Sequence, residues 1–132
     1  MQPAKKFDLI ARLKSFPHAI QGIWVLLATQ HNTRIHAAVG AVVFFLGWKF
    51  RVGNIKFCLL IFAMALVWIA EAFNTVFEIL VDMLSPQIAK KAERAKDVAA
   101  AGVLIAALTA GVIGIWVLGP GLIQYLHGQP AV

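Results

Sequence analysis

The chain has 132 residues, of which 61% are hydrophobic and only 14% are charged. Because so few charged side chains cannot cover a soluble domain of this size, the composition predicts one small membrane domain over residues 1–132. A single Cys58 excludes a disulfide framework or a thiolate metal site, and the net charge of +6, placed at the ends of apolar segments, indicates anionic headgroups or phosphates rather than nucleic acid.

The N-terminal segment, residues 1–34, is basic and amphipathic. Its apolar residues from Phe7 to Ile20 recur at helical spacing with basic residues between them, which predicts a helix lying on the membrane surface. Pro17 and His18 interrupt the apolar stretch and no small-residue cleavage site follows it, so we expect the segment to stay attached rather than to be a cleaved signal peptide.

Three apolar segments follow, at residues 35–50, 55–84 and 96–126. Each is near or above the roughly 17 to 25 residues that a membrane-spanning helix needs, so we expect an all-α protein with three spans. Five basic residues precede the first span and four lie in the second loop, against three around the first turn. This asymmetry places the N-terminus and the second loop in the cytoplasm. Pro120 between two glycines is expected to break or end the third helix.

The second apolar segment carries polar residues on a single face. These are Glu71, Asn74, Thr75, Glu78 and Asp82. At about 100° per residue they fall within one narrow stripe. Asn74 and Thr75 alone would indicate side chains that hydrogen-bond between helices. Three carboxylates at membrane depth are costly, however, and usually mark a function. They repel one another unless a cation or a basic side chain lies among them, and their oxygens suit Mg²⁺.

A basic partner follows directly, because Lys96 and Asp97 open the third span on the same side. A magnesium site with a lysine at headgroup depth provides what phosphoryl transfer requires. Glu71 is the most deeply embedded acid and is placed to take the proton of an attacking hydroxyl, whereas Glu78 lies closer to the side where ATP arrives. The sequence contains no glycine-rich phosphate loop.

Two motifs together resemble the signature of the prokaryotic diacylglycerol kinase and undecaprenol kinase family. They are E-x-x-N-T-x-x-E-x-x-x-D, from Glu71 to Asp82, and A-K-D-V-A-A, from Ala95. The resemblance runs from about Arg12 to Pro120. It implies a small homotrimeric enzyme of the bacterial cytoplasmic membrane, with three spans and a surface helix per subunit. Such enzymes use Mg²⁺ and ATP to phosphorylate a lipid alcohol at active sites shared between subunits.

The same resemblance assigns roles to individual residues. Glu71 stands at the general-base position and Glu78 at a magnesium-ligand position. The nucleotide-binding set comprises Asn74, Asp82, Lys96 and Asp97, with His18 and Gln30 added to it. Gln30 is a departure, because the family usually has a glutamate there as a second magnesium ligand. An amide oxygen still coordinates a cation but brings no charge, so weaker metal binding or a changed metal arrangement is expected.

The segments Ser15–Gly22 and Asn32–His36 look more like the undecaprenol kinase branch than the diacylglycerol kinase branch. Undecaprenol is therefore the favoured substrate and diacylglycerol the alternative. Two further hypotheses remain open. Gln30 would fit a family member with altered or lost activity, and Glu71 would fit a small proton-coupled transporter that consumes no ATP and has no use for Lys96 and Asp97.

Overall fold

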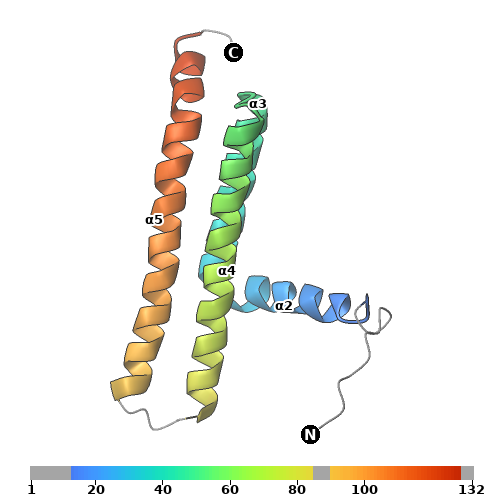
Figure 1. The fold of residues 1–132 in the computed structure, drawn as a ribbon, viewed down its shortest axis with the longest axis vertical. Helices are drawn as coiled ribbons and strands as arrows, with labels where there is room; N and C mark the ends of the chain where they lie inside the picture. Colours follow the sequence, from blue (N-terminus) through green and yellow to red (C-terminus); the bar gives the residue numbers. More distant parts are fainter. Residues whose placement is uncertain (1–12, 85–89, 129–132) are drawn as a thin grey trace, which may run out of the picture.

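The computed structural model describes residues 13–84 and 90–128, and all regular structure in these two ranges is α-helical. The four helices are α2 (Phe16–Thr29), α3 (His31–Lys49), α4 (Asn54–Leu84) and α5 (Lys90–Leu126). The helices α3, α4 and α5 form an elongated bundle, from which α2 projects sideways (Figure 1). The all-α class expected from the sequence is confirmed.

The surface segment and the first span meet at a sharp break rather than at residue 35. Pro17 lies in the first turn of α2, where its missing N–H is tolerated, and α2 ends at Thr29. Gln30 adopts an extended conformation, with φ −100° and ψ 117°, and α3 begins at His31. Residues 31–34, expected in the surface helix, therefore form the start of α3, and residues 1–12 of that expected helix lie outside the described ranges.

Arg34 explains how the chain turns at this break. The last carbonyl groups of a helix have no partner within the helix. Arg34 Nε donates to the carbonyl oxygen of Leu27 at 2.7 Å, and its guanidinium also donates to the carbonyl of Ala28. A cation at a helix C-terminus also interacts favourably with the helix dipole. The first turn of α3 thus holds the end of α2 and sets the direction in which α2 leaves the bundle.

The opposite end of the bundle holds the core. The buried cluster there consists of Phe50, Leu60, Val117 and Leu118, contributed by the α3–α4 turn, α4 and α5. The turn itself needs left-handed backbone at Arg51 (φ 49°) and at Gly53 (φ 65°). Gly47 allows α3 to approach α4 closely, since a Cβ there would lie 3.0 Å from Cε2 of Phe57. The three bundle helices are thus tied together at the turn end.

Pro120 does not end the last helix. The helix α5 runs unbroken from Lys90 to Leu126 with Pro120 inside it, so the expected break at Gly119–Gly121 is wrong. Proline removes one backbone hydrogen bond, but membrane helices tolerate this loss where neighbouring groups compensate locally. Gly121 packs against the ring of Phe50, with the position of an added Cβ 2.9 Å from Cγ of that ring. This contact with the core holds the segment after the proline in helical register.

Two of the described helices, α4 over Asn54–Met83 and α5 over Lys90–Leu126, are long and apolar enough to cross a membrane. Within the most apolar 18 residues of each helix, only 22% of α4 and 6% of α5 is buried inside the structure. They are therefore not the core helices of a soluble protein. At 1.5 Å per residue, α4 is about 46 Å long, against about 30 Å of bilayer hydrocarbon. The helix therefore extends beyond the hydrocarbon at one end or both. The shorter α3 carries His31, Asn32 and Arg34 in its first turn, which lowers its mean hydropathy.

Candidate functional site

The polar stripe of α4 lies at the end of the bundle opposite the core, and its inner part is buried. Glu71, Asn74 and Thr75 are 1%, 7% and 3% exposed. The hydroxyl of Thr75 donates to the carbonyl oxygen of Glu71 at 2.9 Å, and Nδ2 of Asn74 donates to Oε1 of Glu78 at 2.9 Å. The stripe thus holds two separate hydrogen-bonded pairs on one helix, with Glu71 at its buried end and Glu78 half-buried one turn beyond Asn74.

A histidine from α3 contacts the buried end of the polar stripe. Nε2 of His36 lies 3.4 Å from Oε1 of Glu71, and the His36 side chain is only partly buried. Sequence reasoning did not place His36 in the site, because an imidazole near headgroups is more often an ordinary surface group. No pattern along one helix would have found the pair, since it depends on how α3 and α4 are aligned against each other.

The outer part of the stripe meets α5. Nζ of Lys96 donates to Oδ1 of Asp82 at 2.5 Å, across the two helix ends. Asp97 follows Lys96 and is exposed. Because α5 already begins at Lys90, both residues lie within its first turns rather than at its start. The structure therefore brings Asp82 and Lys96 together as the motif spacing indicated, at the end of the bundle that carries Glu78.

Two of the expected site residues make no hydrogen bond or ion pair with this cluster among the described residues. Gln30 is half-buried at the α2–α3 break. His18 is exposed in the first turn of α2, at the end of that helix far from the bundle (Figure 1). Across residues 13–84 and 90–128, no recorded hydrogen bond or ion pair links either side chain to Glu78 or Lys96.

The donor set of one chain suits a magnesium ion only in part. Among the described residues, no group of three or more His, Cys, Asp or Glu side chains lies close enough to hold a metal ion. Mg²⁺ in nucleotide sites needs few protein ligands, because it keeps waters and takes oxygens from the phosphates. Glu78 offers a carboxylate, and Oδ1 of Asn74 is a buried oxygen with no hydrogen-bond partner in the described ranges. These donors fit a nucleotide-bound Mg²⁺ but not a closed protein cage.

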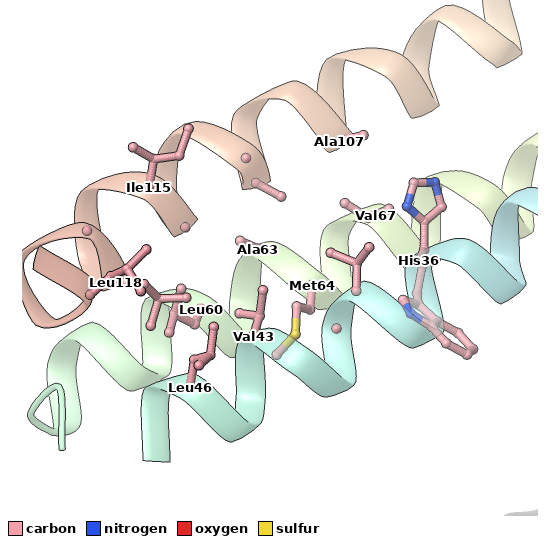
Figure 2. A pocket seen from close by; sticks show the side chains of 18 of the residues that line it. His36, Val43, Leu46, Leu60, Ala63, Met64, Val67, Ala107, Ile115 and Leu118 are labelled. Carbon is pink, nitrogen blue, oxygen red and sulfur yellow. The ribbon is translucent and has the colours of Figure 1, made fainter. Parts of the chain in front are cut away.

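An apolar groove runs along the bundle from His36 toward the core. It has a volume of about 430 Å³ and lies between α3, α4 and α5. Figure 2 shows His36 at one end, with Met64 and Val43 in the middle and Leu60, Leu46 and Leu118 at the other end. An apolar groove that ends beside a buried carboxylate is suited to a molecule with a hydrocarbon chain and a polar head.

Protein comparisons agree with this geometry. The family model for prokaryotic diacylglycerol kinase matches residues 17–118. The chain is 31% identical over 109 residues to a protein named undecaprenol kinase from Bacillus subtilis, with 83% of this chain and 89% of that protein covered. It is 36% identical over 115 residues to a protein named diacylglycerol kinase from Synechocystis sp., with 86% and 66% covered. No solved structure matches the chain.

Long apolar helices and a carboxylate stripe that meets a lysine define a helical membrane protein with an acidic site at one end. The chain belongs to the prokaryotic diacylglycerol kinase family. It is a lipid kinase, and kinase activity implies ATP as the phosphate donor. Membership of an enzyme family favours the kinase over the transporter hypothesis.

Proposed function

We propose that this protein transfers the γ-phosphate of Mg-ATP to the hydroxyl of undecaprenol in preference to diacylglycerol. The observation that carries the proposal is the buried carboxylate of Glu71, which lies between an apolar groove and the acidic and basic groups of α4 and α5. The chain of the lipid lies in the groove and its hydroxyl reaches Glu71. ATP approaches from the end that carries Glu78, Asp82 and Lys96.

In this mechanism the lipid oxygen attacks the γ-phosphorus in line, its O–H bond breaks, and the bond from that phosphorus to the β-phosphate oxygen breaks to release ADP. Glu71 accepts the hydroxyl proton. Lys96, oriented by Asp82, offsets the charge of the phosphates, while Asn74 orients Glu78 through its hydrogen bond. His18, Asp97 and Gln30 complete the nucleotide contacts.

Glu78 and Gln30 are the proposed ligands of Mg²⁺, with Asn74 beside them. When bound, the ion neutralises phosphate oxygens and holds the leaving group in position. Because Gln30 contributes an amide oxygen in place of a carboxylate, the site has one negative charge fewer than the usual family arrangement. The remaining groups of the site are present, which favours a working kinase with an altered metal site over a silent relative.

Three subunits with shared active sites are part of the proposal. Within the described ranges, one chain lacks a group of three acidic, histidine or cysteine side chains that could hold a metal ion. The apolar face of α4 is also uncovered, for example at Phe62, Ile69 and Phe73. A neighbouring subunit would cover such a face and bring in the missing groups.

The proposed topology has three spans, with the N-terminus and the α4–α5 loop in the cytoplasm of a bacterial inner membrane. Lys90, Lys91, Arg94 and Lys96 lie at the same end of the bundle as the carboxylates, which agrees with the excess of basic residues on cytoplasmic sides. The helix α3 packs along α4, and its 19 residues give a length of about 28 Å, close to the hydrocarbon thickness.

The preference for undecaprenol is supported by the Ser15–Gly22 and Asn32–His36 segments and by the relative named undecaprenol kinase, of which 89% is covered. The test is phosphate transfer from radiolabelled ATP to undecaprenol and to diacylglycerol in parallel mixed micelles. We expect label on undecaprenol at the higher kcat/KM. Label only on diacylglycerol would reverse the substrate assignment, and label on neither lipid across a wide Mg²⁺ range would favour the silent relative.

The matched blank in that assay is Glu71→Gln, which keeps the shape of the side chain and removes its basicity. We expect at least about a thousandfold loss of kcat with unchanged binding of a fluorescent ATP analogue, because proton acceptance is lost while the nucleotide contacts remain. Full activity of this variant would refute the role of Glu71.

A further inference from the structure

Three buried polar atoms at the α3–α4 contact have no hydrogen-bond partner among the described residues. They are Oγ1 of Thr33, Oδ1 of Asn74 and Oε1 of Glu71, the last of which lies 3.4 Å from Nε2 of His36 without a hydrogen bond. Thr33 is 1% exposed, as is Glu71, so bulk water does not satisfy them. A buried polar group left without a partner is costly, and such groups in native proteins call for a ligand, an ordered water or a functional role.

The alignment of the two helices places these three residues within about one helical turn of one another along the bundle. His36 lies opposite Glu71, with 3.4 Å between Nε2 and Oε1. In the antiparallel pair, Thr33 lies one turn earlier on α3 and Asn74 one turn later on α4. Thr33 and His36 therefore present the same face of α3 to the buried part of the stripe.

The chemistry of the unpartnered atoms matches a primary alcohol. Oε1 of Glu71 is an acceptor and Oγ1 of Thr33 belongs to a hydroxyl that both donates and accepts, while Oδ1 of Asn74 is the oxygen placed beside Mg²⁺ above. An alcohol has one O–H to give to a carboxylate and two lone pairs to receive a threonine hydroxyl. His36 also lines the apolar groove, so a hydrocarbon chain in that groove would carry its hydroxyl to this place.

We propose that α3 supplies half of the acceptor site, in which Thr33 donates a hydrogen bond to the lipid hydroxyl and His36 holds the Glu71 carboxylate facing it. This inference rests on the proposed kinase mechanism and gives a role in it to two residues of the Asn32–His36 segment that the sequence did not place in the site. Thr33 contacts the substrate, whereas His36 is a positioning residue that acts through Glu71. Threonine and histidine on α3 would thereby orient the attacking oxygen before ATP arrives.

The test for Thr33 compares Thr33→Val, which keeps the shape and removes the hydroxyl, with Thr33→Ser, which restores it. We expect Thr33→Val to lose about tenfold in kcat/KM for the lipid, the size of one hydrogen bond, with KM for ATP unchanged. Thr33→Ser should recover most of this loss. The matched control is Thr109→Val on α5, whose hydroxyl donates to the carbonyl of Ile105 and whose removal should leave the lipid kinetics unchanged.

The test for His36 uses His36→Leu against His36→Gln, because glutamine still donates a hydrogen bond to a carboxylate. We expect His36→Leu to lower kcat about tenfold or more without weakening ATP binding, and His36→Gln to regain part of it. His127→Leu, at the far end of α5, is the control. If His36 had a purely structural role, these variants would have a lower unfolding free energy, and their kinetics for the lipid and their binding of ATP would be impaired together.

The outcomes separate this inference from the proposed function. If the wild-type protein transfers no phosphate to either lipid, the proposed function fails. If the wild type is active and both Thr33→Val and His36→Leu keep its lipid kcat and KM, the kinase mechanism stands and the α3 half-site is overturned. Equal losses in the lipid and ATP parameters would also overturn it, since they would indicate general distortion of the site.

Discussion

Gln30 stands where the sequence resemblance implies a glutamate, and the proposed function assigns it to Mg²⁺ binding. A carboxylate binds Mg²⁺ more strongly than an amide does, because it adds a negative charge to the same oxygen geometry. We expect Gln30→Glu to lower the Mg²⁺ concentration that gives half-maximal lipid phosphorylation. The decrease should be several-fold and should not exceed about tenfold, the effect of one charge contact.

The control for that prediction is Gln21→Glu, which makes the same charge change at an exposed position of α2. It should leave the Mg²⁺ dependence as it is. If both substitutions shift the Mg²⁺ titration equally, the effect arises from general surface charge and Gln30 is not a ligand.

Individual residues differ in how far the sequence alone predicts them. The stripe from Glu71 to Asp82 follows from helical periodicity, and its contact with Lys96 follows from a short connection between two helices. Thr33 and His36 are different, since the Asn32–His36 segment indicated a family branch but gave neither residue a role, and the polar first turn of its helix looks like a headgroup region. Their proximity to the stripe depends on helix register, and register comes from packing that one segment does not encode.

At the scale of elements, the angle between α2 and α3 rests on Arg34. We expect Arg34→Gln to loosen the C-terminal turn of α2, because the carbonyls of Leu27 and Ala28 lose their charged donor. The loss is about 1 kcal/mol for an exposed contact, or roughly fivefold faster amide exchange in α2.

Hydrogen exchange with mass spectrometry checks that expectation, with Arg51→Gln in the α3–α4 turn as the control. The peptides of α4 should exchange as in the wild type. Unchanged exchange in α2 would mean that the break at Gln30 is held by other contacts.

A second prediction at this scale concerns the close approach of α3 and α4. Gly47→Val places a side chain where a Cβ alone would lie 3.0 Å from the ring of Phe57 and 3.2 Å from Leu60. We expect a loss of about 1 to 3 kcal/mol in unfolding free energy, as for overpacked cores. Titration with a denaturing detergent measures it against Gly22→Val, where an added Cβ meets nothing within 4 Å. Equal losses would assign the effect to helix propensity.

The elements show the same division between what a single segment predicts and what it does not. Apolar runs predicted that helices cover residues 55–84 and 96–126, because the length and hydropathy of a segment are local properties, but α5 begins six residues earlier, at Lys90, where the sequence is polar. The break at Gln30 was missed because the polar residues after it, from His31 to Arg34, look like a continuation of a surface helix. The helix through Pro120 was missed because the packing of Gly121 on Phe50 comes from a distant part of the chain.

At the scale of the whole molecule, the proposal of shared active sites makes a prediction for mixed assemblies. Glu71→Gln and Lys96→Met subunits should each be inactive alone. If Glu71 and Lys96 of one working site come from different subunits, co-reconstituting the two variants should restore partial activity. Native mass spectrometry on the same sample should show three copies. Trimers without any recovered activity would place both residues of a working site in one chain, as the Asp82–Lys96 contact would then suggest.

The groove between α3, α4 and α5 also decides which measure of substrate concentration governs the reaction rate. If the lipid occupies this groove as proposed, it reaches His36 and Glu71 from the bilayer by diffusing in two dimensions, and the product leaves by the same path. The rate then depends on the mole fraction of substrate among all lipids and detergents around the protein. Adding inert lipid at constant total substrate should slow phosphorylation, while diluting the whole vesicle suspension should not. The lipid composition of the membrane would thereby set the turnover rate of the kinase.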